Sequence, residues 1–200
     1  MHYYVEITCL PDEGVSAAFI MGKVMDVLHL ALVNLQQQVG SNPVGIGFPE
    51  YVYREDDKGR VEAAQIGGKI RLFSRDQVHL EALNLKQQLQ RLADYVHIKS
   101  ISEIDRPNLA FASFQRVQPK SSKERLIRRK AKHTGQSEDV VREQFESFEE
   151  ERTALPFVHM HSHSSTQAFR LFIAKQIAEP VEEWQFSTYG LNGRVPVPDF

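Results

Sequence analysis

His29 is the first residue in this 200-residue sequence whose type and surroundings suggest chemistry. It lies between Leu28 and Leu30, inside an apolar segment with helical spacing. An imidazole can take or supply a proton near neutral pH, so a histidine held against a substrate can act as a general base. Judged from residue types alone, a histidine in this position is more often at the margin of a helix core than a catalyst.

A basic segment between Arg116 and His133 suits the binding of an anion. It holds one acid, Glu124, and the cations Arg116, Lys120, Lys123, Arg125, Arg128, Arg129, Lys130 and Lys132. Four of these cations are spaced i, i+3, i+4 and i+7: Arg125, Arg128, Arg129 and Lys132. In a helix they lie on one face, where they could contact successive phosphates of a nucleic acid. A solvated helix that serves only solubility has the same pattern. However, like charges at i and i+4 repel each other, and an anionic partner would relieve that repulsion.

Three histidines alternate in a predicted strand, at positions 159, 161 and 163. Alternate residues of a strand point to one face, so the three rings could form a metal site or a weakly cationic surface. No cysteine or acid lies within the run, and we favour the cationic surface. We therefore expect no metal and no cofactor.

The net charge of −2 hides an uneven distribution. Taken alone it argues against a nucleic-acid partner, but the acids gather outside the basic segment, chiefly at Glu138, Asp139, Glu143, Glu146, Glu149, Glu150 and Glu151.

The single cysteine, Cys9, excludes an internal disulfide framework. The sequence also lacks a signal-peptide pattern and an uninterrupted apolar run of about 18 residues, so we expect a cytoplasmic protein without a membrane partner.

The first hundred residues alternate between strand and helix patterns. Strands are predicted at 3–10, 44–48, 69–73 and 96–101, helices at 16–38 and 75–92, and a solvated loop at 54–59. This βαββαβ order is that of the ferredoxin-like fold, which hosts many functions. Arg106-Pro107-Asn108 marks a boundary, so we expect an α+β protein with a ferredoxin-like domain at 1–105 and a smaller α/β domain at 106–200.

The second predicted domain contains the arginine-rich helix. A strand at 109–117 precedes it, and an acidic helix and further strands follow it. Ser121-Ser122-Lys123-Glu124 has the spacing of a capping box, which predicts that the helix begins near Ser122.

Motifs along the whole chain resemble the type I-F CRISPR repeat endoribonucleases. They occur in the order MGKVMDVLH (21–29), FQRVQ (114–118), the arginine helix, LPFV (155–158), the stretch 162–170 and YGL (189–191). That family cleaves RNA by attack of its own 2′-hydroxyl on the adjacent phosphate, without a metal, leaving a 2′,3′-cyclic phosphate and a 5′-hydroxyl. The resemblance implies that His29 is the general base, that Ser162 holds the attacking hydroxyl and that Tyr189 positions the ring or a ribose. Two structural interpretations stay open: Tyr189 could be an aromatic residue that fills the core, and the serines could belong to a turn.

The resemblance also implies an RNA-binding surface. Arg116 and Gln118 are two residues apart, so on a strand they would point to one side and could read a guanine and an adenine at the base of the hairpin. Phe169 matches an aromatic that stacks on a nucleotide. Where family members often carry two further arginines, this chain has Lys132 and His133, which puts bidentate contacts there in doubt. Further RNA contacts are implied for Lys120, Arg125, Arg128, Arg129, Ser164 and Ser165.

The implied partners are a CRISPR repeat hairpin, cut at the 3′ base of its stem, and the other subunits of the type I-F surveillance complex, in which the enzyme stays bound to the hairpin. Two alternatives stay open. One is a hairpin-binding subunit that has lost cleavage. The other is an unrelated ferredoxin-like module whose basic helix binds acidic protein or generic RNA.

Overall fold

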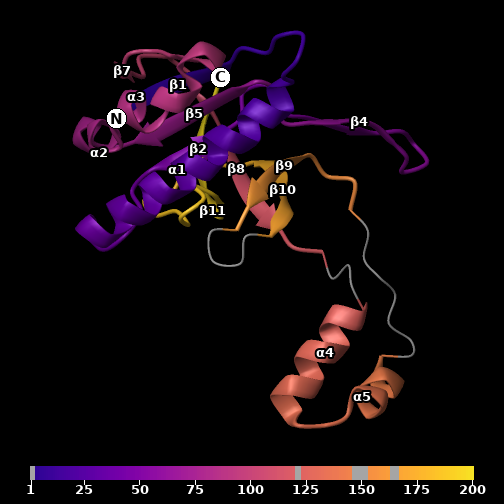
Figure 1. Cartoon of the computed structure of the whole chain (residues 1–200). Coiled ribbons are helices and arrows are strands. Elements are labelled where there is room, and N and C mark those ends of the chain that lie inside the picture. The colour runs from indigo at the N-terminus through magenta and orange to yellow at the C-terminus, as the bar shows by residue number, and fades with distance from the viewer. Residues whose placement is uncertain (1–2, 120–122, 146–152, 163–166) are drawn as a thin grey trace. The chain divides into compact units, whose positions relative to one another are not determined.

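The computed structural model describes residues 3–119, 123–145, 153–162 and 167–200 (Figure 1). The chain divides into two compact units, and each is described by itself. The first comprises Met1–Val117 with Leu155–Phe200, and the second Gln118–Ala154.

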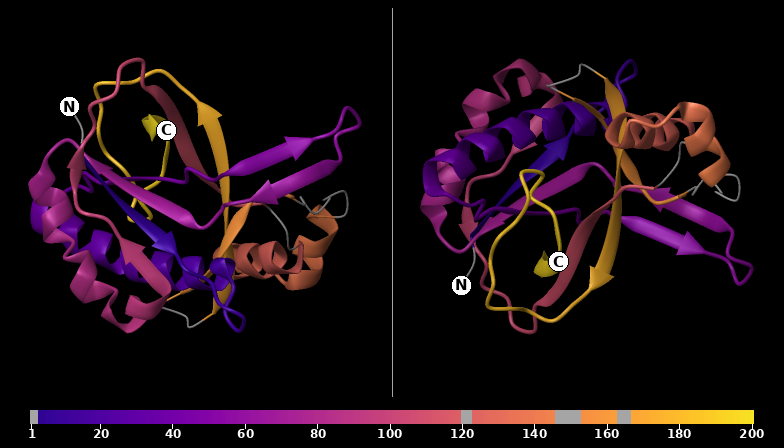
Figure 2. Two further views of the ribbon diagram at one scale, coloured as in Figure 1. Left: turned by 90° about the horizontal axis from the view of Figure 1, so that it is seen from above. Right: turned by 90° about the horizontal axis from the view of Figure 1, so that it is seen from below.

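The first unit contains an antiparallel sheet with the strand order β2-β5-β1-β6, in which β7 also pairs with β1. Its strands are β1 (Tyr3–Cys9), β2 (Gly45–Gly47), β5 (Lys69–Ser74), β6 (Val96–Ile98) and β7 (Ser102–Glu103). A separate hairpin is formed by β3 (Val52–Glu55) and β4 (Val61–Gln65), and it extends beyond the sheets (Figure 2). The α+β class predicted from the sequence is confirmed.

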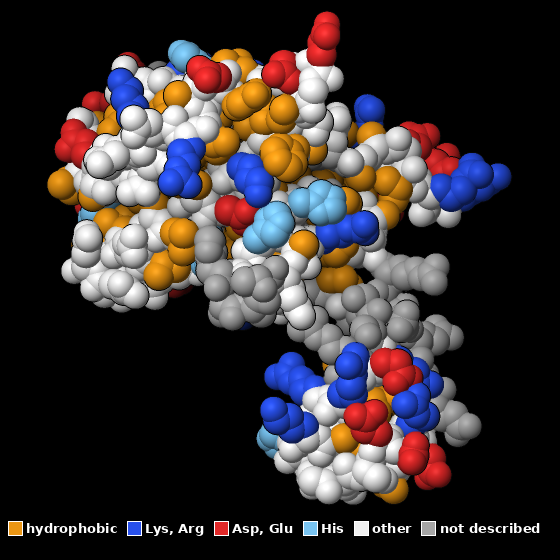
Figure 3. Space-filling view, in the orientation of Figure 1, with side chains coloured by type: hydrophobic (Ala, Val, Ile, Leu, Met, Phe, Trp, Pro, Cys, Tyr) orange, Lys and Arg blue, Asp and Glu red, His pale blue; other side chains and the backbone are white. Residues whose placement is uncertain are grey.

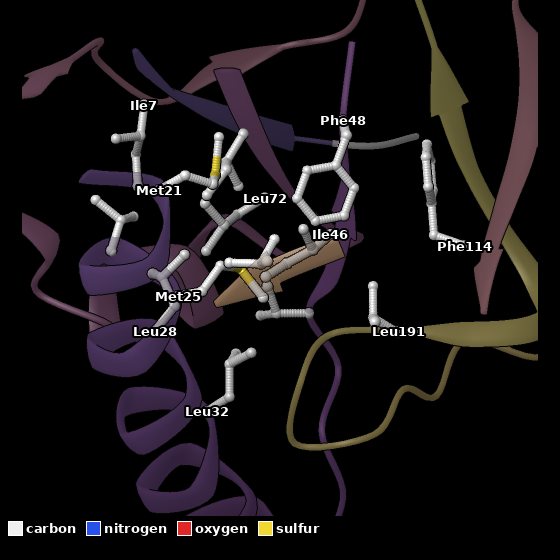
Figure 4. Packing of buried hydrophobic residues seen from close by; sticks show 14 of the residues in the cluster. Ile7, Met21, Met25, Leu28, Leu32, Ile46, Phe48, Leu72, Phe114 and Leu191 are labelled. Atoms are coloured by element: carbon white, nitrogen blue, oxygen red, sulfur yellow. The ribbon is translucent and has the colours of Figure 1, made fainter. Parts of the chain in front are cut away.

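Helix α1 (Ala17–Val39) is the long helix of this unit, and it begins as predicted. Ser16 caps it by accepting a hydrogen bond from the amide of Phe19, and Gly40 ends it with a left-handed φ of 83°. Its buried residues recur at helical spacing: Ile20, Met21, Gly22, Val24, Met25, Leu28, Ala31, Leu32 and Leu35. By length and composition alone α1 could cross a membrane, but half of its apolar stretch is buried inside the protein, where it forms part of the core (Figure 4).

A second antiparallel sheet packs in the same unit, with the order β11-β8-β10-β9. Its strands are β8 (Ala110–Val117), β9 (Phe157–His161), β10 (Ala168–Ile177) and β11 (Asn192–Asp199). Helix α1 approaches the edge strand β9 closely, because Gly22 has no side chain. A Cβ atom at Gly22 would lie 2.4 Å from the carbonyl oxygen of His159. The glycine of the MGKV motif therefore sets the distance between α1 and the second sheet.

The two sheets and α1 share one hydrophobic core. Figure 4 shows side chains of α1, such as Met25, beside Ile46 of the first sheet, with Phe114 of β8 and Leu191 nearby. The rings of Phe48 and Phe114 meet edge to face with centroids 5.5 Å apart. The predicted division into 1–105 and 106–200 follows the change in sequence pattern, whereas the compact units follow this packing.

Two predicted elements differ in the structure. The helix predicted at 75–92 is three short pieces: α2 (Gln77–Ala82), α3 (Leu85–Gln88) and the 3₁₀ helix η1 (Gln90–Tyr95). Asn84 has a φ of 42°, a left-handed conformation that breaks the helix between the first two. The loop predicted at 54–59 includes the turn of the β3–β4 hairpin, where the carboxylate of Asp56 accepts hydrogen bonds from the amides of Lys58 and Arg60.

The second unit is a pair of helices, α4 (Lys123–Thr134) and α5 (Glu138–Gln144). Ile127 and Ala131 of α4 are buried against Val141 of α5. The carboxylate of Glu124 forms a two-pronged ion pair with Arg142. Ser121 and Ser122 lie outside the described residues, so the capping box stays a prediction.

Candidate active site

His29 and Tyr189 form a stacked pair in the first unit. Their ring centroids are 4.2 Å apart, and the ring planes are within 5° of parallel. His29 comes from the middle of α1 and Tyr189 from the turn that precedes β11, so residues from distant parts of the sequence meet at one point. Both side chains are half-buried, which leaves the pair accessible at the surface.

The orientation of the imidazole is set by a backbone carbonyl. Nδ1 of His29 lies 2.9 Å from the oxygen of Thr188. A carbonyl only accepts hydrogen bonds, so Nδ1 must carry the hydrogen, and Nε2 is the nitrogen that holds the lone pair in the neutral ring. This is the tautomer that a general base acting through Nε2 requires.

The turn that carries Thr188 and Tyr189 is held by hydrogen bonds to Asn42, a buried residue that is 1% exposed. The side-chain amide of Asn42 donates to the carbonyl of Ser187 at 2.6 Å, and its backbone carbonyl accepts from the amide of Phe186. Gly190 follows with a φ of 70°, and its carbonyl accepts a hydrogen bond from the amide of Ile46 at 2.7 Å. The glycine of the YGL motif is therefore required by its conformation and by its contact with the first sheet.

Arg116 and Phe169 continue the stack from the second sheet. The guanidinium carbon of Arg116 lies 5.0 Å from the ring centroid of Tyr189 and 5.6 Å from that of Phe169. Arg116 of β8 is paired with Ile173 of β10, and paired residues point to the same face of a sheet. Phe169 is four residues before Ile173 on β10, so the side chains of Arg116 and Phe169 point to the same face. Four of the residues singled out in the sequence thus form a continuous row of planar groups.

Ser162 directly follows β9. The preceding residue, His161, is anchored to Asp26, one helical turn before His29. The carboxylate of Asp26 accepts a hydrogen bond from the amide of His161 at 2.9 Å and lies 3.2 Å from Nδ1 of its ring. The amide of Ser162 itself donates to the carbonyl of Gln167.

Of the other predicted RNA-binding residues of the strands and loops, the structure describes only some. Strand β8 ends at Val117, so Gln118 follows the strand and belongs to the second unit, and its side-by-side arrangement with Arg116 stays a prediction. Lys120, Ser164 and Ser165 lie outside the described residues.

Helix α4 presents its cations to solvent. Arg128, Arg129, Lys132 and His133 are exposed, while Ile127 on the opposite side packs on α5. Arg125 belongs to α4, but its side chain lies outside the described part of the chain. The described members of the predicted row therefore share an open helix surface.

His159 and His161 point to one face of β9, since the strand alternates between exposed and buried residues. His163 lies outside the described residues. Within residues 3–119, 123–145, 153–162 and 167–200, no group of three or more histidine, cysteine, aspartate or glutamate side chains could hold a metal ion.

Comparison with known proteins identifies the family. The model of a family described as "CRISPR-associated protein (Cas_Csy4)" matches residues 4–200. The chain belongs to the Cas_Csy4 family. Two relatives are named CRISPR-associated endonuclease Cas6/Csy4, and each match covers 100% of both chains. The relative from Escherichia coli (strain UTI89 / UPEC) is 32% identical over 203 residues, and the one from Pseudomonas aeruginosa (strain UCBPP-PA14) is 30% identical over 201 residues. The resemblance inferred from the motifs is confirmed.

Two parts of the site in this Cas_Csy4 chain were not predicted from its sequence. The carbonyl of Thr188 that orients His29 is a backbone group, which residue types do not reveal. Asp26, in contrast, gave a signal: it is a carboxylate in an apolar helix, three residues before His29 and therefore on a neighbouring face.

Proposed function

We propose that the chain is an endoribonuclease that cuts the repeat hairpin of a CRISPR precursor transcript at the 3′ base of its stem, without a metal ion. The observation that carries this proposal is the stacked pair of His29 and Tyr189, with Nδ1 of His29 bonded to the carbonyl of Thr188. The endonuclease names of the two relatives support it.

The proposed reaction is an internal transesterification. The 2′-hydroxyl at the cut site gives its proton to Nε2 of His29 and forms a bond to the adjacent phosphorus. The bond from phosphorus to the 5′-oxygen of the next nucleotide breaks, and that oxygen takes up a proton. The products carry a 2′,3′-cyclic phosphate and a 5′-hydroxyl. Positioned proton transfer of this kind typically contributes about 10²–10⁴ in rate.

Tyr189 and Ser162 are proposed to position the reacting groups. Tyr189 covers one face of the imidazole, which opposes rotation of the ring about its Cβ–Cγ bond. Ser162 would hold the 2′-hydroxyl, since such a group reacts only when it lies behind the leaving oxygen. The anchoring of His161 to Asp26 supports this role, because it attaches the start of the serine segment to the catalytic helix.

Arg116 and Phe169 are proposed to bind the foot of the hairpin. A guanidinium held between two aromatic rings keeps its planar donors in a fixed orientation, as recognition of a guanine edge requires. Phe169 would stack on an adjacent nucleotide, and Gln118 would read the neighbouring base.

The second unit is proposed to grip the stem with Arg125, Arg128, Arg129, Lys132 and His133. Side chains cannot easily read sequence in the deep groove of an A-form helix, so this contact would sense phosphates and shape. Lys120, Ser164 and Ser165 are proposed as further contacts on the grounds of the family resemblance.

Three wider features belong to the same proposal. The strand order β2-β5-β1-β6, with α1 between β1 and β2, supports a ferredoxin-like arrangement interrupted by the β3–β4 hairpin. The protein would stay on its product hairpin and join the other subunits of a type I-F surveillance complex. Its proposed place is the cytoplasm, where the transcript is made.

The test is cleavage of the host's repeat RNA in excess chelator, with mapping of both product ends. Wild-type protein should leave a 2′,3′-cyclic phosphate and a 5′-hydroxyl at the 3′ foot of the stem. His29→Ala should bind the hairpin with nearly unchanged affinity and fail to cut it. Cutting by His29→Ala, or a requirement for added magnesium, would exclude this mechanism.

A hairpin-binding subunit without cleavage is the second candidate. The endonuclease names of the two relatives favour cleavage over a purely binding role. The same assay separates the two, since such a subunit would bind tightly and leave the RNA intact.

A further inference from the structure

The outward face of β9 and β10 carries an array of aromatic and cationic residues that the proposed reaction does not use. Phe157 is paired with Phe172 across the two strands, and His159 with Arg170. Paired residues of antiparallel strands point to the same face. Val158 and its partner Leu171 alternate with them and are buried, so the array faces away from the core.

Phe157 lies at the centre of this array. The guanidinium carbon of Arg170 is 4.8 Å from its ring centroid, and the rings of His159 and Phe172 meet it edge to face at 5.0 and 5.4 Å. The ring is nevertheless 36% exposed. Aromatic rings that remain open beside cations are typical of surfaces where unpaired bases stack and phosphates are neutralised.

A groove of about 820 Å³ borders the array. One wall is the start of α1, with Ala17 and Met21, another is the β3–β4 hairpin, with Val52 and Ala64, and the third is β9 with Phe157. Figure 3 shows histidine side chains beside cationic and hydrophobic ones over β9 and β10 on this side of the molecule. The groove therefore has largely apolar walls, with His159 on its β9 side and Glu50 as its acidic lining residue.

The array lies on the opposite face of the sheet from Arg116 and Phe169, but β9 connects it with the segment of the proposed cut site. Strand β9 runs from Phe157 to His161, and Ser162 follows it. The four steps of extended chain from Phe157 to His161 span about 13 Å. An RNA strand that leaves the cut site along β9 would therefore pass His161 and His159 before it reaches Phe157.

We propose that this array and groove bind the single-stranded RNA on the 3′ side of the cut, with Phe157 as a stacking platform and Arg170 and His159 as phosphate contacts. The inference rests on the proposed function and adds a second RNA-binding site to it. Charge favours RNA over a protein partner, because Arg170 is exposed in the array and Glu50, the acid that lines the groove, is paired with Lys69 at 2.9 Å.

The test compares three RNAs that carry a 2′-deoxy sugar at the cut site and so cannot be cleaved. One is the hairpin alone, one has a short unpaired extension on its 3′ side, and one has the same extension on its 5′ side. Fluorescence anisotropy at fixed salt gives each dissociation constant. The 3′ extension should tighten binding to wild-type protein about fivefold or more, as expected for one stacked base.

Phe157→Ala and Arg170→Ala should each abolish most of this gain and keep the affinity for the hairpin alone. Ile177→Ala is the matched control, because Ile177 lies on the same strand as Arg170, is 89% exposed and stands outside the array. It should keep the full gain.

The possible failures are distinguishable. If wild-type protein does not bind the hairpin alone, the proposed function fails. If it binds the hairpin but gains no affinity from the 3′ extension, or gains affinity only from the 5′ extension, the second site is disproved. The second site is also disproved if both variants keep the gain in affinity. Loss of binding to another protein in Phe157→Ala, with the RNA gain intact, would also disprove it and assign the face to protein contacts.

Discussion

The carbonyl of Thr188 holds Nδ1 of His29 at 2.9 Å, and the next residue, Tyr189, covers the face of the same ring. One short turn therefore sets both the tautomer and the plane of the proposed base. Changes to this turn should alter cleavage without touching the histidine itself.

Gly190→Ala tests the turn. A Cβ atom there would lie 2.5 Å from Ile46, and φ is 70°, so the variant is strained in two ways. We expect a loss of about 1–3 kcal/mol in the free energy of unfolding, measured by urea denaturation, and slower single-turnover cleavage. Gly59→Ala is the control, because its φ is 73° but nothing lies within 4 Å of the new Cβ. Equal cleavage by both variants would contradict the role of the turn.

Tyr189 is predicted to act through its ring face. Tyr189→Phe keeps the stack and should cleave nearly as fast as wild type, whereas Tyr189→Leu frees the imidazole and should be slower by about tenfold or more, within the range that orientation of a base contributes. Single-turnover rates at saturating protein give the comparison. A large loss in Tyr189→Phe would instead point to the hydroxyl.

Arg116 is predicted to need its planar guanidinium and not charge alone. Arg116→Lys should weaken hairpin binding nearly as much as Arg116→Ala, by about 1–3 kcal/mol, because an ammonium cannot form the paired contact. Arg194→Ala, an exposed position of β11, is the control. Binding isotherms on hairpins with and without the basal guanine check the result, and recovery of affinity by lysine would argue for simple charge attraction.

Arg128 and Arg129 are predicted to contact phosphates. Replacing both with alanine should weaken binding at low salt and reduce the slope of log affinity against log salt by about one for each phosphate that is no longer neutralised. Arg54 and Lys58 of the hairpin β3–β4 and its turn, replaced together, form the matched control. An unchanged salt slope in the α4 variant would show that the helix faces away from RNA.

Glu6 is predicted to make stability depend on pH. Burial by itself raises the pKa of this carboxyl, but hydrogen bonds from Lys99 and Arg71 hold it below its ordinary value of 4.5. The contribution of ionised Glu6 to the free energy of unfolding is therefore present above pH 4.5 and is lost as pH falls through the lowered pKa. Glu6→Gln should cost about 3 kcal/mol at neutral pH and flatten the fall in stability in more acidic solution, measured by urea denaturation across that range. A curve parallel to wild type would contradict this.

Local patterns predicted the elements that carry the site, because those elements obey local rules. Helix α1 has a cap at Ser16 and a buried stripe at helical spacing. The β3–β4 hairpin was missed since its strands are short, largely exposed and show no alternation between buried and exposed residues. The break at Asn84 was missed because the apolar helical spacing continues past it, although asparagine adopts a left-handed conformation more readily than most residues.

The site itself was only partly predictable. Motifs supplied the residue types, and the family resemblance supplied their roles. The row from His29 through Tyr189 and Arg116 to Phe169 depends on sheet register and on a turn fixed by Asn42, which are long-range features that spacing does not encode.

The order of strands in the second sheet has a practical consequence. Val117, where the chain leaves for the helical unit, and Phe157, where it has returned, both stand opposite Phe172 on either side of β10. Two strand spacings separate them, about 10 Å. The helical unit is therefore inserted between two neighbouring positions of one sheet. A linker of a few residues could replace it, and the helical units of relatives could be grafted at the same place.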